Sequence, residues 1–327
     1  MNWQGCRVLV TGAGGFIGSH LAERLVELGA RTRALVHYNA LGSQGWLDES
    51  PRRRDLEIVA GDIRDRDSVR GAVRGSEVVF HLAALIAIPY SYRAPESYVQ
   101  TNVLGTMNVM QAAREDAVRR VVHTSTSEVY GTARYVPIDE AHPLQGQSPY
   151  SASKIGADKM AEAFHASFSV PVVTVRPFNT FGPRQSARAI VPTIIAQALA
   201  GEEVRLGSLH PTRDLNYVEN TVQGFVRAAE SDQAPGRTIN LGSGREISVG
   251  DLAGLVATRL GRPLRLAADA QRVRPERSEV ERLCADNRLA AELLGWRPEV
   301  ALEEGLDRTI EWMKSNLERY RPGDYVV

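Results

Sequence analysis

The stretch VLVTGAGGFIGSHLAERL, residues 8–25, decides the fold. It begins as a run of aliphatic residues typical of a buried strand and ends in a pattern typical of an amphipathic helix. Gly12, Gly15 and Gly18 lie between the two, where glycines allow a tight turn and let a helix amino terminus approach a pyrophosphate. The stretch predicts the first strand, turn and helix of a dinucleotide-binding fold, although its spacing is GxxGxxG rather than GxGxxG.

Short apolar runs alternate with helical patterns through the first half of the chain. The strand-like runs are RVLVTG, RTRALV, LEIVAGDI, EVVFHLAA, RRVVHTSTS and VPVVTVRPFN. Parallel strands need the crossover connections that lie between these runs, so the order predicts an α/β fold: a doubly wound parallel Rossmann sheet with helices on both faces. Shorter elements after about residue 180 predict a smaller C-terminal lobe. We expect the sheet domain to comprise residues 1–178 and about 212–244, and the lobe residues 179–211 and 245–327.

Composition indicates an ordinary globular protein and excludes several classes of function. The 327 residues are 43% apolar and 24% charged, with 39 acidic and 39 basic side chains, so net charge predicts neither nucleic acid nor an anionic membrane as a partner. Cys6 and Cys284 form no CxxC pattern, which suits a reducing compartment. The amino terminus lacks the pattern of a signal peptide, and no apolar run approaches a membrane span. We therefore expect a cytoplasmic protein.

Two kinds of enzyme site are not predicted. The seven histidines are scattered, and none pairs with another at metal-ligand spacing, so we expect no metal. The chain also lacks the GxSxG elbow of the Ser-His-Asp hydrolases of the α/β class.

Other residues at strand ends extend the dinucleotide interpretation. Asp62, in GDIRD, could hold an adenine edge, and the small residues of HLAA leave room for a ribose. NAD-specific sites usually carry an acid after the second strand, but His37, Tyr38 and Asn39 stand there. Because that carboxylate is missing, NAD is only slightly favoured and NADP is left open. The residues expected to form the cofactor site are Gly12, Gly15, Phe16, Ile17, Gly18, His37, Asn39, Asp62, Ile63, Leu82, Ala83, Ala84, Asn102, Thr124, Tyr150 and Lys154.

Two further motifs carry chemistry. Tyr150 and Lys154 form YxxxK in a helical segment, so the two side chains lie one turn apart on one face. A nearby ammonium favours the phenolate of a tyrosine whose ordinary pKa is about 10, which would make Tyr150 a base. The stretch TSTSEVYG, residues 124–131, places hydroxyl groups and one carboxylate, Glu128, at the end of a predicted buried strand.

The motifs TGAGGFIG, GDI, HLAA, TSTSEVYG, YSASK and RPFNTFGPR together resemble the extended short-chain dehydrogenase/reductase family, in its nucleotide-sugar-modifying branch. The resemblance covers almost the whole chain. It implies a tightly held nicotinamide cofactor and a C-terminal lobe that binds a nucleoside diphosphate sugar. It also implies that Thr126 binds the sugar O4, Tyr150 takes the O4 proton, and Lys154 binds the nicotinamide ribose.

Glu128 favours one activity within the branch. Simple 4-epimerases need the hydroxyl, the tyrosine and the lysine, whereas 4,6-dehydratases use an acid beside the hydroxyl to remove the C5 proton once C4 is a ketone. Ser127 stands where dTDP-glucose 4,6-dehydratases carry Asp and GDP-mannose 4,6-dehydratases carry Ser. A serine is too weak an acid to protonate the leaving O6, so we expect Glu128 to transfer the proton itself.

The finer resemblance is to NAD-dependent 4,6-dehydratases of legionaminic-type amino-sugar pathways, which implies UDP- or GDP-N-acetylglucosamine as substrate. The alternatives are a UDP-glucuronate decarboxylase, whose motifs are similar, and a nucleotide-sugar 4-epimerase. A non-enzymatic dinucleotide sensor is a further alternative, but it would not need Thr126, Glu128, Tyr150 and Lys154 together.

Arginines and one asparagine in the second half of the chain are expected to bind the substrate. Arginine guanidinium groups bind phosphate oxygens in pairs, and a strand-end amide can donate to a diphosphate or sugar oxygen. The expected substrate residues are Asn179, Arg184, Arg188, Arg213 and Arg274, with Glu279 a weaker choice. The helical segments ESYVQTNVLGTMNVMQAAR and SASKIGADKMAEAFHASF carry more small and apolar residues than one core face needs. They suit the four-helix dimer interface of the family that the chain resembles, so the resemblance implies a homodimer.

Overall fold

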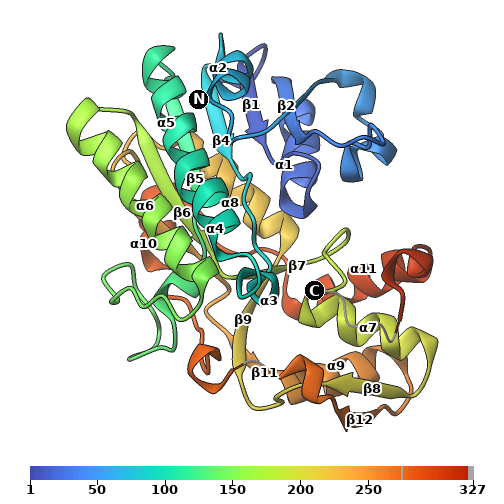
Figure 1. Cartoon of the computed structure of the whole chain (residues 1–327). Helices are drawn as coiled ribbons and strands as arrows, with labels where there is room; N and C mark the ends of the chain where they lie inside the picture. Colours follow the sequence, from blue (N-terminus) through green and yellow to red (C-terminus); the bar gives the residue numbers. More distant parts are fainter. Residues whose placement is uncertain (274, 323–327) are drawn as a thin grey trace.

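A seven-stranded parallel sheet forms the centre of the large domain in the computed structural model, which describes residues 1–273 and 275–322 (Figure 1). Its strand order is β10-β6-β5-β4-β1-β2-β3, and every adjacent pair is parallel. The strands are β1 (Arg7–Thr11), β2 (Arg31–His37), β3 (Leu56–Gly61), β4 (Val78–His81), β5 (Arg120–Thr124), β6 (Val172–Pro177) and β10 (Thr238–Leu241). The predicted doubly wound α/β fold is confirmed.

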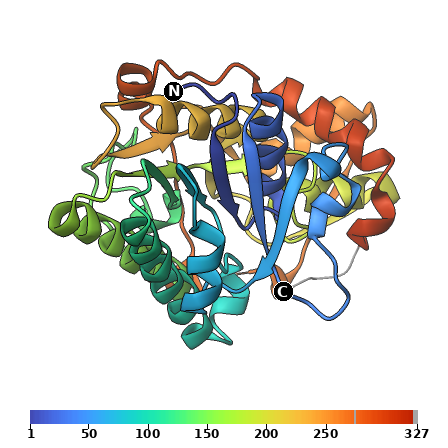
Figure 2. The same cartoon turned by 90° about the horizontal axis from the view of Figure 1, so that it is seen from above.

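Helices cover both faces of this sheet because its strands are apolar on both sides. One face is covered by α2 (Arg66–Val73), α5 (Gly105–Glu115) and α6 (Pro149–Phe168). The other is covered by α1 (Phe16–Glu27) and α8 (Val218–Glu230), with α10 (Arg288–Leu294) packed beside α8. Figure 2 shows the two helical layers from above, with the strands between them. Alternate strand residues such as Val8 and Leu9 enter the two separate cores.

A smaller lobe is built from two short sheets and three helices. One sheet has the order β11-β9-β7, and β8 pairs with β12 in the other. The strands are β7 (Asn179–Phe181), β8 (Glu203–Leu206), β9 (Thr212–Tyr217), β11 (Glu246–Ser248) and β12 (Arg265–Ala268), and the helices α7 (Ile190–Ala200), α9 (Val249–Leu260) and α11 (Leu302–Lys314). β9 pairs with β7 and β11, so it belongs to the smaller lobe, and the chain rejoins the large domain only at α8 (Val218–Glu230).

We keep the division into a sheet domain and a lobe as a proposal. In this proposal the second part of the sheet domain begins at Val218 and not near residue 212.

Irregular helical turns carry several site residues. Between β4 and α5 lie α3 (Ile88–Ser91), α4 (Pro95–Tyr98) and a π-helical turn, η3 (Val99–Leu104). The 3-10 turns include η1 (Gly45–Glu49), η4 (Ser127–Tyr130), η6 (Glu276–Ser278) and η7 (Leu317–Tyr320). Such turns are frequent where helices are interrupted at functional sites. Among residues 1–273 and 275–322, none of the helices has the length and apolar character that a bilayer crossing requires.

Candidate active site

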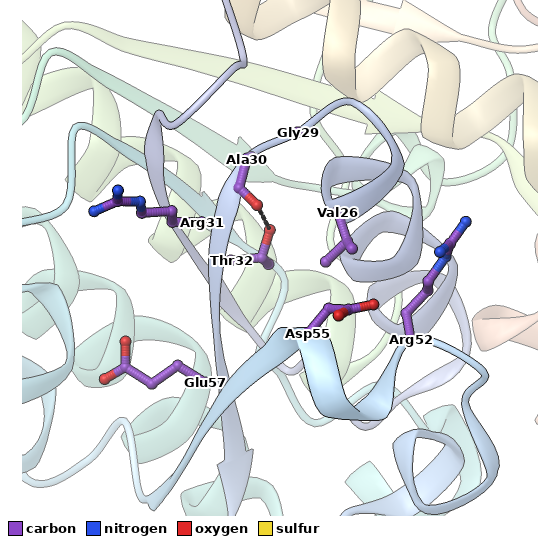
Figure 3. A pocket seen from close by; sticks show the side chains of 8 residues that line it. All are labelled: Val26, Gly29, Ala30, Arg31, Thr32, Arg52, Asp55 and Glu57. Carbon is purple, nitrogen blue, oxygen red and sulfur yellow. Dashed lines mark hydrogen bonds between the residues drawn. The ribbon is translucent and has the colours of Figure 1, made fainter.

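The predicted site residues gather at the carboxyl ends of the central strands. In open α/β sheets, ligands bind at this edge where the strand order reverses, which here is the crevice between β1 and β4. Figure 3 shows a different hollow, of about 440 Å³, at the amino end of β2 beside β3. Arg31, Arg52, Asp55 and Glu57 line it, and it contains none of the predicted site residues. The chemistry therefore belongs to the opposite edge of the sheet.

The glycine turn is packed so closely that side chains would not fit. Gly12 has a φ of +70°, and a Cβ atom there would lie 2.8 Å from the Ala83 backbone nitrogen. A Cβ atom on Gly18 would lie 2.2 Å from the Gly12 carbonyl oxygen. The Thr11 hydroxyl accepts hydrogen bonds from the Leu82 and Ala83 amides, each at 3.1 Å. The turn after β1 and residues 82–84 after β4 thus form one cradle beside the amino terminus of α1.

The residues expected near the adenosine lie together at the ends of β2 and β3. The Asp62 carboxylate accepts a 2.6 Å hydrogen bond from Arg64 and lies 3.6 Å from the His37 ring. The hydrogen bonds from Arg64 hold the pKa of Asp62 below its usual range. Asn39 donates to the Ser43 carbonyl at 2.7 Å and so shapes the loop after β2. Arg64 was not predicted as a site residue. The one feature of the sequence that indicates this contact is the position of Arg64 two residues after Asp62.

The predicted catalytic residues come from η4, from its cap, and from the first turns of α6. Thr126 caps η4, and its hydroxyl accepts from the Glu128 amide at 3.2 Å. Burial has the largest effect on the pKa of Tyr150, but Thr126 lies close enough to lower this pKa and the Glu128 carboxylate lies close enough to raise it. A capping box formed by Ser148 and Ser151 fixes the start of α6, which places Tyr150 in its first turn. The structure therefore brings the predicted catalytic residues together, and all of them are buried.

The electrostatics of the pair Tyr150 and Lys154 differ from the sequence expectation. Burial raises the pKa of Tyr150 well above its ordinary value, and Thr126 opposes this only in part. The Lys154 Nζ atom donates to the Thr124 carbonyl at 2.6 Å. Burial also lowers the pKa of Lys154 to about 8, although the Asp158 carboxylate opposes the change. Desolvation, rather than the lysine charge, thus dominates the pKa of the tyrosine hydroxyl in this fold.

A buried network that was not predicted lies behind the lysine. The Asp158 carboxylate accepts from Ser125 at 2.7 Å and from Arg176 at 2.9 Å, and it lies 3.2 Å from the His123 ring. Burial would raise the pKa of Asp158, but the His123 hydrogen bond and the Arg176 charge lower it to about 2. The spacing along α6 could have indicated Asp158, because this residue follows Lys154 at the same four-residue interval at which Lys154 follows Tyr150. All three side chains therefore lie on one face of the helix.

The described residues fit a bound dinucleotide. The glycine cradle has room for backbone only, and the buried Thr124 hydroxyl has no hydrogen-bond partner among the described residues. An orphaned buried polar atom is costly unless a ligand or water satisfies it. Ile63 is buried beside Gly105, and Leu82, Ala83 and Ala84 follow β4 as predicted. Asn102, by contrast, is fully engaged, since it bonds both backbone groups of Leu85 and the Ser153 hydroxyl.

The four expected substrate residues that the structure describes divide into three groups. The Oδ1 atom of Asn179, at the start of β7, is buried without a partner among the described residues, as a ligand-binding amide would be. Arg184 forms a 2.9 Å ion pair with Glu23 of α1, and Arg213 forms a 3.0 Å ion pair with Glu279. Arg188 is exposed and donates to the Ser186 hydroxyl at 3.2 Å. Arg274 lies outside the described residues. Apart from that position, no cluster of three or more His, Cys, Asp or Glu side chains in residues 1–322 is arranged to hold a metal.

Comparison with known proteins places this chain among nucleotide-sugar enzymes. Residues 9–309 match the family described as GDP-mannose 4,6 dehydratase. The UDP-glucose 4-epimerase of Mycolicibacterium smegmatis is 36% identical over 317 residues, which span 94% of this chain and 99% of that protein. The dTDP-glucose 4,6-dehydratase of Streptomyces antibioticus is 33% identical over 321 residues, 96% of this chain and 94% of that one.

A solved structure is similar over nearly the whole length. The crystal structure of DesIV, a dTDP-glucose 4,6-dehydratase from Streptomyces venezuelae, contains NAD and TYD. It superposes with a TM-score of 0.86 at 30% identity, and the match covers 96% of this chain and 99% of that chain. Relatives of both activities therefore share this fold at comparable identity.

Proposed function

Because the chain belongs to the NAD-dependent nucleotide-sugar dehydratase and epimerase family, within the extended short-chain dehydrogenases/reductases, we propose that it is a 4,6-dehydratase of UDP- or GDP-N-acetylglucosamine. The relatives divide between dehydratases and epimerases, so the residues of the site must distinguish the two. The observation that carries the proposal is Glu128. Its side chain belongs to a residue only 9% exposed, on the turn that Thr126 caps, and it acts electrostatically on Tyr150.

The surroundings of Glu128 suit a chemical role. The residue is mostly buried, yet its carboxylate oxygens are not among the fully buried unpaired atoms, so they are accessible to a ligand. Among the described residues, neither an ion pair nor a side-chain hydrogen bond holds the Glu128 carboxylate, while its backbone amide bonds to Thr126. The buried acid Asp158, in contrast, has several partners. An acid held beside a Tyr-Thr pair without partners of its own is suited to proton transfer with a ligand.

The bound nicotinamide would supply a reversible hydride acceptor, held by the glycine cradle and by Lys154. The chain's own residues then divide the proton transfers. Tyr150 takes the O4 hydroxyl proton, and Thr126 hydrogen-bonds O4. With C4 as a ketone, Glu128 removes the C5 proton, and the C6–O bond breaks as a C5–C6 double bond forms. The C6 hydroxyl leaves as water with the proton taken from C5. Addition of the hydride at C6 and of a proton at C5, which balances the one that Tyr150 took from O4, gives a 4-keto-6-deoxy sugar.

Ser127 makes the dual role of Glu128 necessary. The serine is buried next to Glu128, and a neutral hydroxyl cannot donate a full proton to the departing oxygen near neutral pH. We propose that Glu128 carries the C5 proton to O6 and that Ser127 only positions O6. A protonated carboxyl is a far stronger acid, since the ordinary pKa of Glu is about 4.3.

Two other activities share the first step. The Mycolicibacterium smegmatis relative favours a 4-epimerase, which would return the hydride to C4 and have no use for Glu128. A UDP-glucuronate decarboxylase would use the C4 ketone to release carbon dioxide from C6. The epimerase would leave the C5 proton in place, whereas the decarboxylase would add a proton at C5 after carbon dioxide leaves. Glu128 therefore argues against the epimerase, and the substrate panel below distinguishes dehydration from decarboxylation.

Incubation with a panel of UDP-, GDP- and dTDP-sugars, followed by mass spectrometry, tests the proposal. We expect UDP- or GDP-N-acetylglucosamine to lose the mass of one water, with no added oxidant because the cofactor is regenerated. Unchanged mass with inversion at C4 would establish the epimerase, and loss of carbon dioxide from a glucuronate would establish the decarboxylase. Either result would contradict the dehydratase assignment.

We also propose that the enzyme is a homodimer through a four-helix bundle, with two helical segments from each copy. Large apolar side chains are exposed on the helical segment that contains η3 and α5, and at the end of α6. They are Val99 (55% exposed), Leu104 (40%), Met107 (36%) and Phe168 (45%). Light scattering is expected to show a dimer mass that Leu104→Glu reduces to a monomer. A wild-type monomer at every concentration would contradict this.

A further inference from the structure

The segment after β2 lies across the glycine turn. We call residues Gln44–Glu49, which include η1, the strap. The Trp46 amide donates to the Gly14 carbonyl at 3.0 Å. A Cβ atom on Gly14 would lie 2.5 Å from the Gln44 carbonyl, and one on Gly45 would lie 2.3 Å from the Gly14 carbonyl. Backbone therefore packs directly on backbone, and any displacement of the strap removes one wall of the turn.

The outer side of the strap is held by the C-terminal part of the chain. The ring of Trp46 meets Trp312 of α11 edge-on, with centroids 5.6 Å apart and planes at 70°. The Arg319 guanidinium of η7 lies 5.3 Å from the Trp46 ring, and the same arginine pairs with Glu49. Figure 2 shows the red C-terminal helix beside the blue segment that follows β2. We call Trp312, Arg319 and Tyr320 the bracket.

The bracket also reaches the connection between β7 and α7. Tyr320 is buried, stands edge-on to Trp312 at 6.1 Å, and donates its hydroxyl to the Gln185 carbonyl at 3.0 Å. Residue 185 follows Arg184, which pairs with Glu23 of α1. The bracket thus ties together three segments around the glycine turn: the strap, the start of the smaller lobe and, through it, α1.

We propose that the bracket retains the dinucleotide, with Trp46 as a positioning residue that acts through the backbone of Gly14. In the proposed cofactor site the amides of the turn would bind the pyrophosphate, so their geometry would decide how long the cofactor stays bound. A strap released from the bracket would have to be ordered again on each binding event, which weakens binding. Family chemistry makes retention useful, because the cofactor returns to its starting oxidation state in every turnover. The proposal depends on dinucleotide binding but not on which sugar reacts.

Binding of NAD to the apoenzyme, measured by calorimetry and by the rate of NAD release, tests this proposal without any sugar. Trp46→Ala removes both ring contacts of the strap, and we expect its Kd for NAD to rise about tenfold, mostly through faster release. A tenfold change corresponds to about 1.4 kcal/mol, within reach of one aromatic pair plus one cation–π contact. Arg319→Ala, which leaves the aromatic pair intact, should raise the Kd about threefold.

Arg308→Ala is the matched control. Arg308 also lies in the C-terminal part of the chain, and its side chain is 42% exposed, against 37% for Arg319. Like Arg319, it combines an aromatic contact, here with Tyr217, with ion pairs, here with Glu219 and Glu304. It touches no part of the strap, so its variant should bind NAD like the wild type. If Trp46→Ala does not fold, Arg319→Ala together with Trp312→Phe decides the question. Unchanged NAD affinity and release in folded variants would show that the bracket only stabilises the fold, and would leave the dehydratase assignment untouched.

Discussion

Replacement of Glu128 by glutamine tests the role of its carboxylate with little disturbance of the fold. Gln has almost the same shape, and the Glu128 amide that bonds to Thr126 is unaffected by the change. Among the described residues no side-chain partner of the carboxylate is lost, so the free energy of unfolding should change by less than about 0.5 kcal/mol. The change instead removes the proposed base for C5 and the acid for O6.

The expected loss can be estimated from the two proton transfers. A positioned acid or base contributes about 10²–10⁴-fold, and each factor of ten corresponds to about 1.4 kcal/mol of barrier. Since one carboxylate serves both transfers in series, and Ser127 cannot replace it, kcat for dehydration should fall by at least about 10³-fold. Oxidation at C4 depends on Thr126, Tyr150 and Lys154, so it should persist. The variant should accumulate reduced nicotinamide when it binds the sugar.

The assay combines product mass spectrometry with absorbance of the reduced nicotinamide in a single turnover. In deuterated water, wild-type product should carry deuterium at C5, and Glu128→Gln should not place it there. Glu140→Gln is the matched control: Glu140 accepts from the Asn240 amide at 2.8 Å, a bond that a glutamine oxygen can keep, and it lies outside the site. Dehydration within tenfold of wild type in Glu128→Gln would refute the assignment.

Three further predictions concern the cradle, the buried network and the lysine. Gly18→Ala should abolish NAD binding, measured by calorimetry, because its Cβ would meet a carbonyl at 2.2 Å, whereas Gly71→Ala, with open space around its Cβ, should bind normally. Asp158→Asn should lower the free energy of unfolding in urea by about 3–5 kcal/mol, because it leaves the buried Arg176 charge unpaired. The pKa of Asp158 is about 2 in the folded protein, below its ordinary 3.8, so the wild type loses this stabilisation as the pH falls below about 4. The difference between variant and wild type should therefore become smaller there. Burial lowers the pKa of Lys154 to about 8, so its ammonium group loses its charge as the pH rises through about 8, and kcat/KM should fall over the same range. Arginine stays charged at higher pH, so Lys154→Arg should move this fall in kcat/KM to higher pH. A wild-type kcat/KM that stays constant above pH 8 would contradict this.

The sequence was sufficient for the parts of the site that depend on short-range order. Thr126 and Glu128 lie on one turn, and Tyr150 and Lys154 lie one helical turn apart, so local geometry alone determines each pair. The parallel sheet was predictable for a related reason. Alternating strand and helix patterns permit few topologies, and all of them bring the carboxyl ends of the central strands to one edge.

The sequence could not predict which acidic residue pairs with each arginine. The arginines look alike along the chain, but Arg184 pairs with Glu23, which is 161 positions away, and Arg213 pairs with Glu279, 66 positions away. The pKa of Tyr150 could not be predicted for the same reason, because the desolvation that raises it comes from packing between distant segments. Local spacing predicts which candidate catalytic groups lie side by side, and only the assembled fold gives their ionisation.

The paired arginines also limit how a diphosphate can be bound. Arg213 is buried, and its ion pair with Glu279 is largely out of water. A phosphate could gain this guanidinium only if the acid remained as a second partner or moved away, and breaking a buried pair costs several kcal/mol. Arg188 is exposed and bonds only a hydroxyl among the described residues, so its guanidinium can reach a phosphate at little cost. Arg188→Ala should therefore raise KM for the nucleotide sugar more than it lowers kcat, while Arg184→Ala should mainly destabilise the contact with α1.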